Sequence, residues 1–573
     1  MSIATEESIP TKKSVKMRVF LSWLAGSVAA YFLTSFFSNF HPLLYQFIVL
    51  GLLFQLLCGT AAFLFLNETL ERSKAGSHID PLAVLTLLVA LGLSVAAAIV
   101  SWQFPGLFQR RILFMASSGL PLFGLLSLLS LGASIVLIER LERNGSLERF
   151  KQTRFFKFTQ PNLPGLLLAI FFLMTYLIFA ESINFPGFRT LDQFFDTDIS
   201  EWLTRLTSTT LQDASPVRAV HPAILLFLRP PVWFLSLFLN GNRLQAVFLM
   251  NALAGAACVL LTWLIVKRAS GNTTYALIMA AILGSSSSHL LLSSMLETYI
   301  YSALALLFFT FLIQNEYTSL KLTVPAGIVV FGITVTNLVQ TCILYFFNHP
   351  RIKVIVKYIL IVVIITAALN LLQVRVYPNA RSLFQPANLE REQYYLWNPF
   401  DFSWRTIGRF SLIARAIPLY GVVAPTSFVL KEELGVEFPN FRTYQILLGE
   451  FHVAGYRGAA DVTVKFWMVI LAVAGILFLL DIFRSPRQVS FALSLLLCLG
   501  FSFSLHLVYG DDPMLYSPNW VYALVLFVGL MLQRWADRRW LQISLIVFLV
   551  MLMNANLGLI RQIMEVSAPH FGK

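Results

Sequence analysis

The segment LPGLLLAIFFLMTYLIFA, residues 163–180, is an uncharged apolar run long enough to form a membrane-spanning helix. Similar runs recur along the whole chain of 573 residues, which is 57% hydrophobic and only 12% charged, with a mean hydropathy of +0.73. A backbone inside lipid must satisfy its own hydrogen bonds, and runs of about 20 apolar residues do so as helices. The sequence therefore predicts an all-α polytopic membrane protein.

An acidic stretch follows that run. Residues 194–222 read FFDTDISEWLTRLTSTTLQDASPVRAVHP, and Asp192, Asp196 and Asp198 fall within seven residues. So many ionisable groups beside a span are unusual in a chain with so little charge. A solvated connecting loop is the simple interpretation, whereas an active site at the membrane surface also explains the composition, and we favour it.

The basic residues indicate how the helices are oriented. The net charge is +13, but the lysines and arginines collect in short loops between spans, where they set topology, so nucleic-acid binding is not expected. Residues 139–157 form the strongest cluster and should face the cytoplasm, which sends the acidic stretch to the outer face. The four cysteines lie inside apolar runs at wide spacing, which favours neither a disulfide framework nor a zinc site.

The apolar runs and loops predict four regions. They are an N-terminal four-helix transmembrane unit at 1–157, a transmembrane core at 158–373 whose first external loop is 181–242, an external loop or cap region at 374–463, and C-terminal transmembrane helices at 464–573.

Two apolar segments are not expected to cross the membrane once. Residues 221–239 contain Arg229 followed by two prolines, which are costly at mid-membrane depth, so we expect one or two helices in the outer interface. A single crossing by Val324 to Phe347 would place three later basic clusters outside. A break near residues 334–337 into two half-helices returns them inside, and it predicts a cavity near Asn337.

The polar groups placed on the outer face suit one chemistry. A carboxylate there can accept the proton of an acceptor hydroxyl, and arginines can bind a departing phosphate. These are the needs of glycosyl transfer from a lipid phosphate-sugar. A cytoplasmic nucleotide-sugar is not the expected donor, since the sequence has no Gly-rich phosphate loop.

A resemblance to a known family rests on four ordered features of residues 160–560. They are the acidic loop, the His-Pro start of the next segment at His221, a span that begins with Arg243 and ends in Lys-Arg, and a Ser-rich turn that carries Glu297. Together they resemble the GT-C superfamily of polyprenyl-phosphate-sugar-dependent membrane glycosyltransferases, which includes protein O-mannosyltransferases and the lipid A aminoarabinose transferase. The first four helices lie outside the resemblance, and their role is left open.

The resemblance implies an inverting transferase with an aspartate of the first external loop as base. Asp198 is the first candidate and Asp196 the second. An Asp-Thr-Asp replaces the strict acidic pair of some family members, which leaves the assignment between the two open. The candidate ligands of the donor phosphate are Arg218, Arg381, Arg405, Arg409 and Arg415.

Other polar residues are candidates for substrate contact or support. His221 is expected to fix the loop by hydrogen bonding and to cap the following helix rather than to act as base. Glu297 is a partner for Arg218 or His221, an acceptor for a sugar hydroxyl, or a solvent-facing charge. His506 and Tyr516 can close the cavity from the other side, or belong to a plain connecting loop. No cofactor is expected; a hard cation bound by the acidic residues is conceivable but not favoured.

The expected partners are a polyprenyl-phosphate sugar donor, membrane lipids, and an acceptor that is a glycan, a lipid or a protein. The expected location is the bacterial inner membrane, with the active site facing the periplasm. Two rival classes are an O-antigen polymerase or ligase that uses diphosphate-linked glycans, and a lipid or glycan transporter. The latter predicts inverted repeats and mid-membrane charges, which the sequence does not show.

Overall fold

The structure is a computed structural model that describes residues 12–74, 80–108, 112–184, 193–211, 216–401, 403–430, 439–482 and 486–571. Asp192 of the acidic stretch lies outside the described residues.

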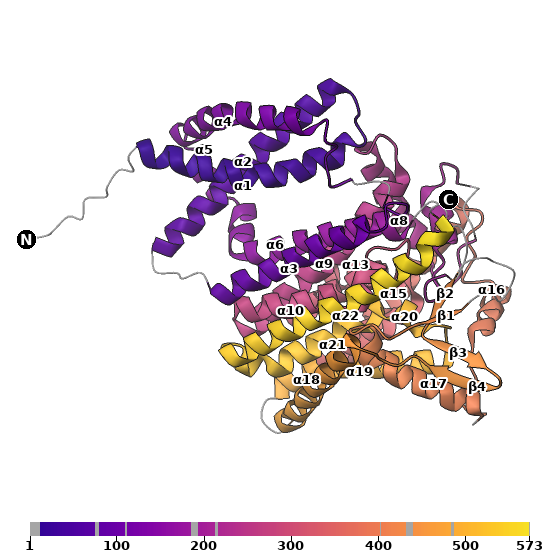
Figure 1. The fold of residues 1–573 in the computed structure, drawn as a ribbon. Helices are drawn as coiled ribbons and strands as arrows, with labels where there is room; N and C mark the ends of the chain where they lie inside the picture. The colour runs from indigo at the N-terminus through magenta and orange to yellow at the C-terminus, as the bar shows by residue number, and fades with distance from the viewer. Residues whose placement is uncertain are drawn as a thin grey trace, which may run out of the picture. The chain divides into compact units, whose positions relative to one another are not determined.

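Helices make up 77% of the described residues, and Figure 1 shows how they are arranged. Among the described residues, ten helices are long and apolar enough to cross a membrane. They are α1 (Lys12–Ser38), α2 (Leu44–Lys74), α3 (Pro81–Trp102), α4 (Leu120–Arg143), α6 (Arg154–Ile183), α9 (Arg243–Ser270), α15 (Ile352–Val376), α18 (Ala459–Asp481), α19 (Pro486–Val508) and α22 (Arg539–Phe571). The predicted all-α polytopic membrane class is therefore confirmed.

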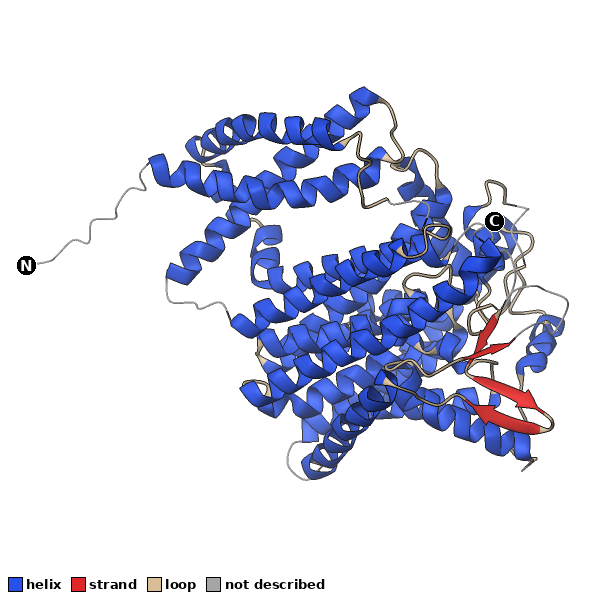
Figure 2. Cartoon of the chain, viewed as in Figure 1, coloured by secondary structure: helices blue, strands red, loops and turns tan. Residues whose placement is uncertain are grey.

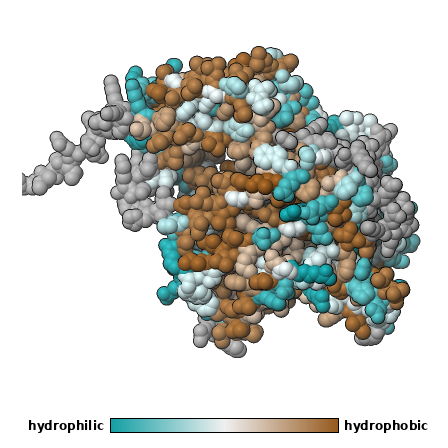
Figure 3. Space-filling model, in the orientation of Figure 1, coloured by the Kyte–Doolittle hydropathy of each residue, from teal (hydrophilic) through white to brown (hydrophobic). Residues whose placement is uncertain are grey.

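Shorter helices fill the interior and the loops. They are α5 (Ser146–Lys151), α7 (Ile199–Thr207), α8 (Ile224–Leu237), α10 (Thr273–Ser285), α11 (Ser287–Leu292), α12 (Tyr299–Gln314), α13 (Leu320–Ile333), α14 (Leu338–Asn348), α16 (Pro386–Glu390), α17 (Trp404–Arg415), α20 (Pro513–Tyr516) and α21 (Pro518–Met531). Apolar side chains cover much of the outward surface of the helices, as Figure 3 shows, which is the surface that lipid would contact.

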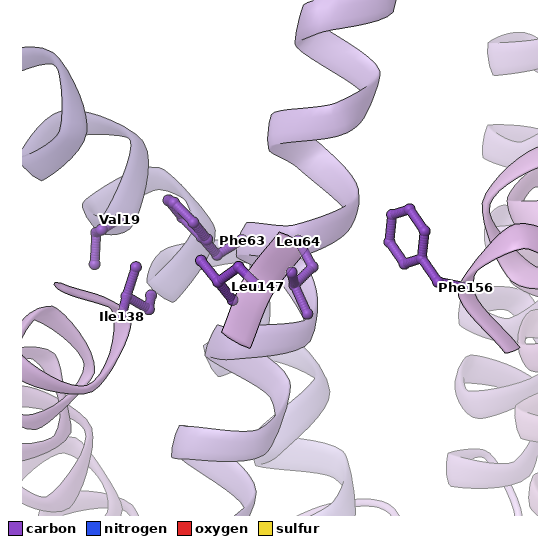
Figure 4. Close-up of a cluster of buried hydrophobic side chains, with 6 residues drawn as sticks. All are labelled: Val19, Phe63, Leu64, Ile138, Leu147 and Phe156. Atoms are coloured by element: carbon purple, nitrogen blue, oxygen red, sulfur yellow. The ribbon is translucent and has the colours of Figure 1, made fainter. Parts of the chain in front are cut away.

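The chain divides into two compact units. The first comprises Met1–Asp80 and Arg110–Leu163. Its α1, α2 and α4 pack together, and α5 adds Leu147 to a buried apolar cluster with the start of α6 (Figure 4). The members of that cluster are Val19, Phe63, Leu64, Ile138, Leu147 and Phe156.

The second unit comprises Pro81–Gln109 and Pro164–Lys573. The predicted N-terminal unit at residues 1–157 included α3. In the structure α3 belongs to the second unit, where it packs with α10 and α22. One face of α3 carries small buried residues, and Ser94 Oγ lies 2.9 Å from Thr175 Oγ1 of α6. Small and hydroxylated residues let membrane helices approach closely and bond across the contact, so the sequence of α3 favours its place among the core helices.

The predicted break within residues 324–347 is confirmed. α13 ends at Ile333, a 3₁₀ turn covers Val335–Asn337, and α14 begins at Leu338. The hydroxyl of Tyr345, near the end of α14, donates to the carbonyl of Thr318, just before α13 begins, at 2.8 Å. The two half-helices therefore form a hairpin whose ends lie together.

The region after α15 folds into short elements rather than an irregular loop. Strand β1 (Phe428–Leu430) pairs antiparallel with β2 (Asn440–Arg442), with Val429 opposite Phe441. Strand β3 (Tyr444–Leu447) pairs with β4 (Glu450–Val453) through a two-residue turn. Figure 2 shows both small sheets at one end of the helices. The β1–β2 sheet positions the acidic stretch, because Phe441 of β2 pairs with its backbone.

Candidate functional site

Backbone pairing fixes the start of the acidic stretch. The amide of Phe441 in β2 donates to the carbonyl of Gln193 at 2.7 Å, and the amide of Phe195 donates to the carbonyl of Phe441 at 2.8 Å. Phe195 and Asp196 both adopt positive φ angles, of 57° and 68°. Such a conformation is unfavourable for residues other than glycine, so the surrounding contacts hold this turn in place.

Asp196 is ion-paired. Its Oδ1 lies 3.0 Å from Nη1 of Arg442, at the end of β2, and each side chain is 14% exposed. The same guanidinium nitrogen lies 3.9 Å from Asp511. Arg442 was missed in the sequence because it is 246 residues from Asp196, and a lone arginine in a long polar region gives no local signal.

Asp198 is placed differently. It precedes α7 and makes no side-chain capping bond, and within the described part of the chain its carboxylate has no hydrogen bond or ion pair, although it is half-buried. Burial raises the pKa of this carboxyl above its ordinary value, while the nearby charges of Arg205 and Arg218 act in the opposite direction. The carboxylate is therefore available to a ligand.

Glu297 lies beside Asp198. It is 1% exposed, and its Oε1 accepts a hydrogen bond from the amide of Asp198 at 3.1 Å, while its Oε2 accepts from the amide of Thr298 at 2.7 Å. Burial, with a further contribution from the Asp198 charge, raises the pKa of Glu297 to about 8. Among the described residues Glu297 bonds neither Arg218 nor His221, and it is not solvent-facing, so it positions the start of α7.

Two buried asparagines hold the turn that carries Glu297. Asn184 Nδ2 donates to the carbonyl of Ser294 at 2.6 Å, and its Oδ1 accepts from the amide of Leu296 at 3.1 Å. Asn251 in α9 donates to the carbonyl of Met295. Amides inside apolar helices were the available sequence signal for this support, since unbonded amides are expensive there.

Arg218 lies near Asp198 but is ion-paired with Glu392. Its Nε donates to Glu392 Oε1 at 3.2 Å, and its Nη2 donates to Glu392 Oε2 and to the hydroxyl of Tyr509. The guanidinium also lies 4.0 Å from the ring centre of Tyr395. Glu392 and the two tyrosines were not predicted, because they are contributed by the cap region and by the loop after α19.

Two other arginines lie in the same region, Arg205, which acts on Asp198, and Arg381, which acts on Arg205. Arg205 in α7 bonds Glu201 and the carbonyl of Pro216, but its buried Nε has no hydrogen-bond partner among the described residues. Burial lowers the pKa of Arg205 to about 10, opposed by the Asp198 and Glu297 charges. Arg381 is fixed by its amide, which donates to the carbonyl of Val217 at 3.0 Å.

The side chain of Arg381 is the least committed of the predicted phosphate ligands. Within the described ranges its guanidinium has no hydrogen bond or ion pair, and it is close enough to Arg205 to lower the pKa of that residue. Arg205 acts on Asp198, and Arg381 acts on Arg205, so the two cations add positive potential to this region, which favours binding of an anion.

The arginines of α17 are placed elsewhere. Arg409 is 1% exposed and donates to the carbonyls of residues 506, 509, 510 and 511, so it holds the loop after α19. Arg405 lies over Trp404 at 5.2 Å, and Arg415 lines a separate cavity between α17 and β4. In the part of the chain that the structure describes, none of these three arginines bonds Asp196 or Asp198.

His221 fixes the loop, as expected, but does not cap α8. Its Nδ1 lies 2.6 Å from the carbonyl of Ile333, and the N-cap position of α8 is Ala223. Burial lowers the pKa of His221 to about 4, with the positive charges of Arg218 and Arg205 acting in the same direction. A neutral Nδ1–H that donates to this carbonyl is the consistent state, which places the histidine in a supporting role.

The remaining candidates are His506, Tyr516 and Asn337, and each is buried. Tyr516 packs edge-on against Tyr299 at 5.2 Å and stacks with His506 at 4.7 Å. His506 is buried and also contacts Trp520, which indicates a packing role. Asn337 donates to Asn519 Oδ1 at 3.0 Å, so it joins the broken helix to α21.

Among the described residues, no group of three or more histidine, cysteine, aspartate or glutamate side chains is arranged to hold a metal ion. Comparisons with protein-family models, curated proteins and solved structures find no match to this chain.

Proposed function

We propose that this protein is an inverting membrane glycosyltransferase of the GT-C type, which moves a sugar from a polyprenyl phosphate to an acceptor hydroxyl. The observation that carries the proposal is the Asp198 carboxylate. It is half-buried, has no partner among the described residues, and lies between Glu297 and a group of arginines. A carboxylate prepared in this way suits proton transfer from a bound hydroxyl.

Asp198 is favoured over Asp196 as the base. The carboxylate of Asp196 is engaged in the ion pair with Arg442 at 3.0 Å. Burial raises the pKa of Asp198 and so its affinity for a proton. In this proposal Asp196 and Arg442 fix the loop, and Glu297 fixes the backbone of Asp198.

The reaction is a single displacement. Asp198 takes the proton of the acceptor hydroxyl, and the hydroxyl oxygen forms a bond to the anomeric carbon from the face opposite the phosphate. The bond between that carbon and the phosphate oxygen breaks, and its electron pair leaves with the polyprenyl phosphate. In this proposal Arg381 and Arg205, which lie near each other, stabilise the departing phosphate. Arg218 shapes the site through Glu392 and Tyr395.

The proposal includes a location. Ten apolar helices indicate an integral membrane protein. The basic loops favour the outer face for the acidic stretch, and polyprenyl-phosphate sugars are substrates of envelope assembly, so we infer the bacterial inner membrane with a periplasmic site.

The test is sugar transfer by purified protein in nanodiscs, with a panel of radiolabelled polyprenyl-monophosphate sugars and membrane extract as acceptor. Asp198→Asn should lower turnover by about 10²–10⁴-fold, the usual contribution of a general base, and Asp196→Asn should lower it less. Asp461→Asn is the matched control, since Asp461 is an exposed carboxylate paired with Lys465 at the start of α18.

Each variant is checked for monodisperse elution and an unchanged unfolding midpoint. Unchanged turnover in a folded Asp198→Asn variant would show that Asp198 is not the base. If no monophosphate sugar is transferred while diphosphate-linked glycans are, the polymerase or ligase class replaces this proposal.

A further inference from the structure

A second positively charged site lies beside α7 and α8 and is lined by Arg229 and Arg243. A cavity of about 200 Å³ is lined by residues of α7, α8, α9 and the loop between α7 and α8, together with Tyr377. One water needs only about 15 Å³ of such space, so the cavity admits a larger group. Its lining residues are Leu206, Thr209, Leu211, Arg229, Pro230, Trp233, Arg243 and Tyr377.

Two guanidinium groups meet at this cavity. Arg229 Nη2 donates to the carbonyl of Ser208 at 2.7 Å and to that of Thr210 at 3.2 Å, and Arg243 Nη1 donates to the same Ser208 carbonyl. Two cations that share one neutral acceptor repel each other. In the described part of the chain, neither guanidinium forms an ion pair with a carboxylate.

Arg229 also has unused donor capacity. Arg229 is only 8% exposed, and its Nη1 has no hydrogen-bond partner among the described residues. A buried cation with an unsatisfied donor is costly unless an anion or another acceptor completes it. The guanidinium lies 5.0 Å from the ring centre of Tyr377, which fixes its plane beside the cavity.

The rim of the cavity is apolar and faces outward. α8 exposes Trp233, Phe234, Leu237 and Phe238, each by about half. Trp233 both lines the cavity and belongs to this exposed face. Tryptophan and other aromatic residues at the end of an apolar surface are typical of the membrane interface, where phosphate headgroups lie. A ligand with a phosphate and an acyl or prenyl chain fits both parts.

We propose that the Arg229–Arg243 cavity binds the phosphate of a membrane lipid, with the lipid chain against the exposed face of α8. Guanidinium groups bind phosphate through charge-assisted hydrogen bonds, and the phosphate supplies the acceptor that Nη1 lacks. The site does not use Asp198, and it stands whether or not the chain transfers sugars. Two lipid sources share this chemistry, a glycerophospholipid and a polyprenyl phosphate.

The test is native mass spectrometry of the full-length protein released from detergent. The probes are phosphatidylglycerol, a polyprenyl phosphate, phosphatidylcholine as a zwitterionic control, and inorganic phosphate. We expect retention of at least one of the two anionic lipids, and Arg229→Gln and Arg243→Gln should each weaken it about tenfold or more. Arg457→Gln, which removes an exposed arginine outside the cavity, should leave it unchanged.

The variants are compared at equal thermal stability, because Arg229 also supports the loop before α8. Arg229→Lys keeps the charge with fewer donors and should retain part of the binding. Preference for phosphatidylglycerol identifies a glycerophospholipid site, and preference for the polyprenyl phosphate identifies a site for the donor class. Equal binding by Arg243→Gln and wild type, or retention of phosphatidylcholine as strong as that of both anionic lipids, would overturn the proposal.

Discussion

The ion pair between Asp196 and Arg442 should couple the acidic stretch to the cap region. A double-mutant cycle of Asp196→Asn, Arg442→Gln and the double variant isolates their interaction. With 3.0 Å between the charged atoms, the attraction at an effective dielectric constant of about 20 is about 5.5 kcal/mol. Desolvation of two largely buried ions offsets more than half of this, so we expect a coupling energy of about 2 kcal/mol.

Unfolding in mixed micelles with increasing dodecyl sulfate, followed by tryptophan fluorescence, measures the four free energies. Arg442→Gln should be more destabilising than Asp196→Asn, because it removes the contact with Asp511 at 3.9 Å as well as the ion pair with Asp196.

The exposed pair of Asp461 and Lys465 provides the control cycle, and its coupling should be about 0.3–0.5 kcal/mol. If the substitutions at Asp196 and Arg442 are additive to within about 0.5 kcal/mol, the pair does not anchor the acidic stretch.

Three further outcomes are expected. The pKa of Glu297 is raised to about 8, so its contribution to stability is present at low pH and is lost as pH rises through about 8. The stability of Glu297→Gln relative to wild type should therefore improve between pH 5 and pH 9. A pH-independent difference in unfolding free energy would contradict this. The pKa of His221 is lowered to about 4, so its contribution to stability is present above about pH 6.5 and is lost as pH falls towards 4. The loss in unfolding free energy should be about 3 kcal/mol. His221→Asn should abolish that acid-dependent loss in thermal unfolding curves. Gly255→Ala would place a Cβ atom 2.2 Å from Ser293 Oγ and should destabilise the fold by about 1–3 kcal/mol, whereas Gly475→Ala, in an open position, should not; equal unfolding midpoints for the two variants would refute the packing described.

The sequence predicted the membrane class and the broken helix because both depend on local properties. Hydropathy over about 20 residues decides whether a segment can span a membrane, and the positions of basic clusters limit how often the chain crosses. The break between Ile333 and Leu338 followed from that count, and the structure contains it. The grouping of α3 with the core was missed, because hydropathy alone does not say which spans are neighbours.

The candidate site shows the same division. From the sequence alone, Asp198 was the first candidate but the assignment between it and Asp196 stayed open, and the five arginines could not be ranked. Packing distinguishes them: Arg442 pairs with Asp196 across 246 residues, Glu392 pairs with Arg218 across 174, and Arg409 holds backbone carbonyls about 100 residues away. No local pattern records such distant partners.

The sequence by itself therefore determined the helical membrane fold, the positions of most spans and the acidic stretch that carries the candidate base. Only the tertiary structure decided which carboxylate is paired and which is open, and which arginines are committed to structure. The physical reason is that hydropathy is a property of single segments, whereas the charge state and availability of a side chain depend on desolvation and on partners contributed by distant segments.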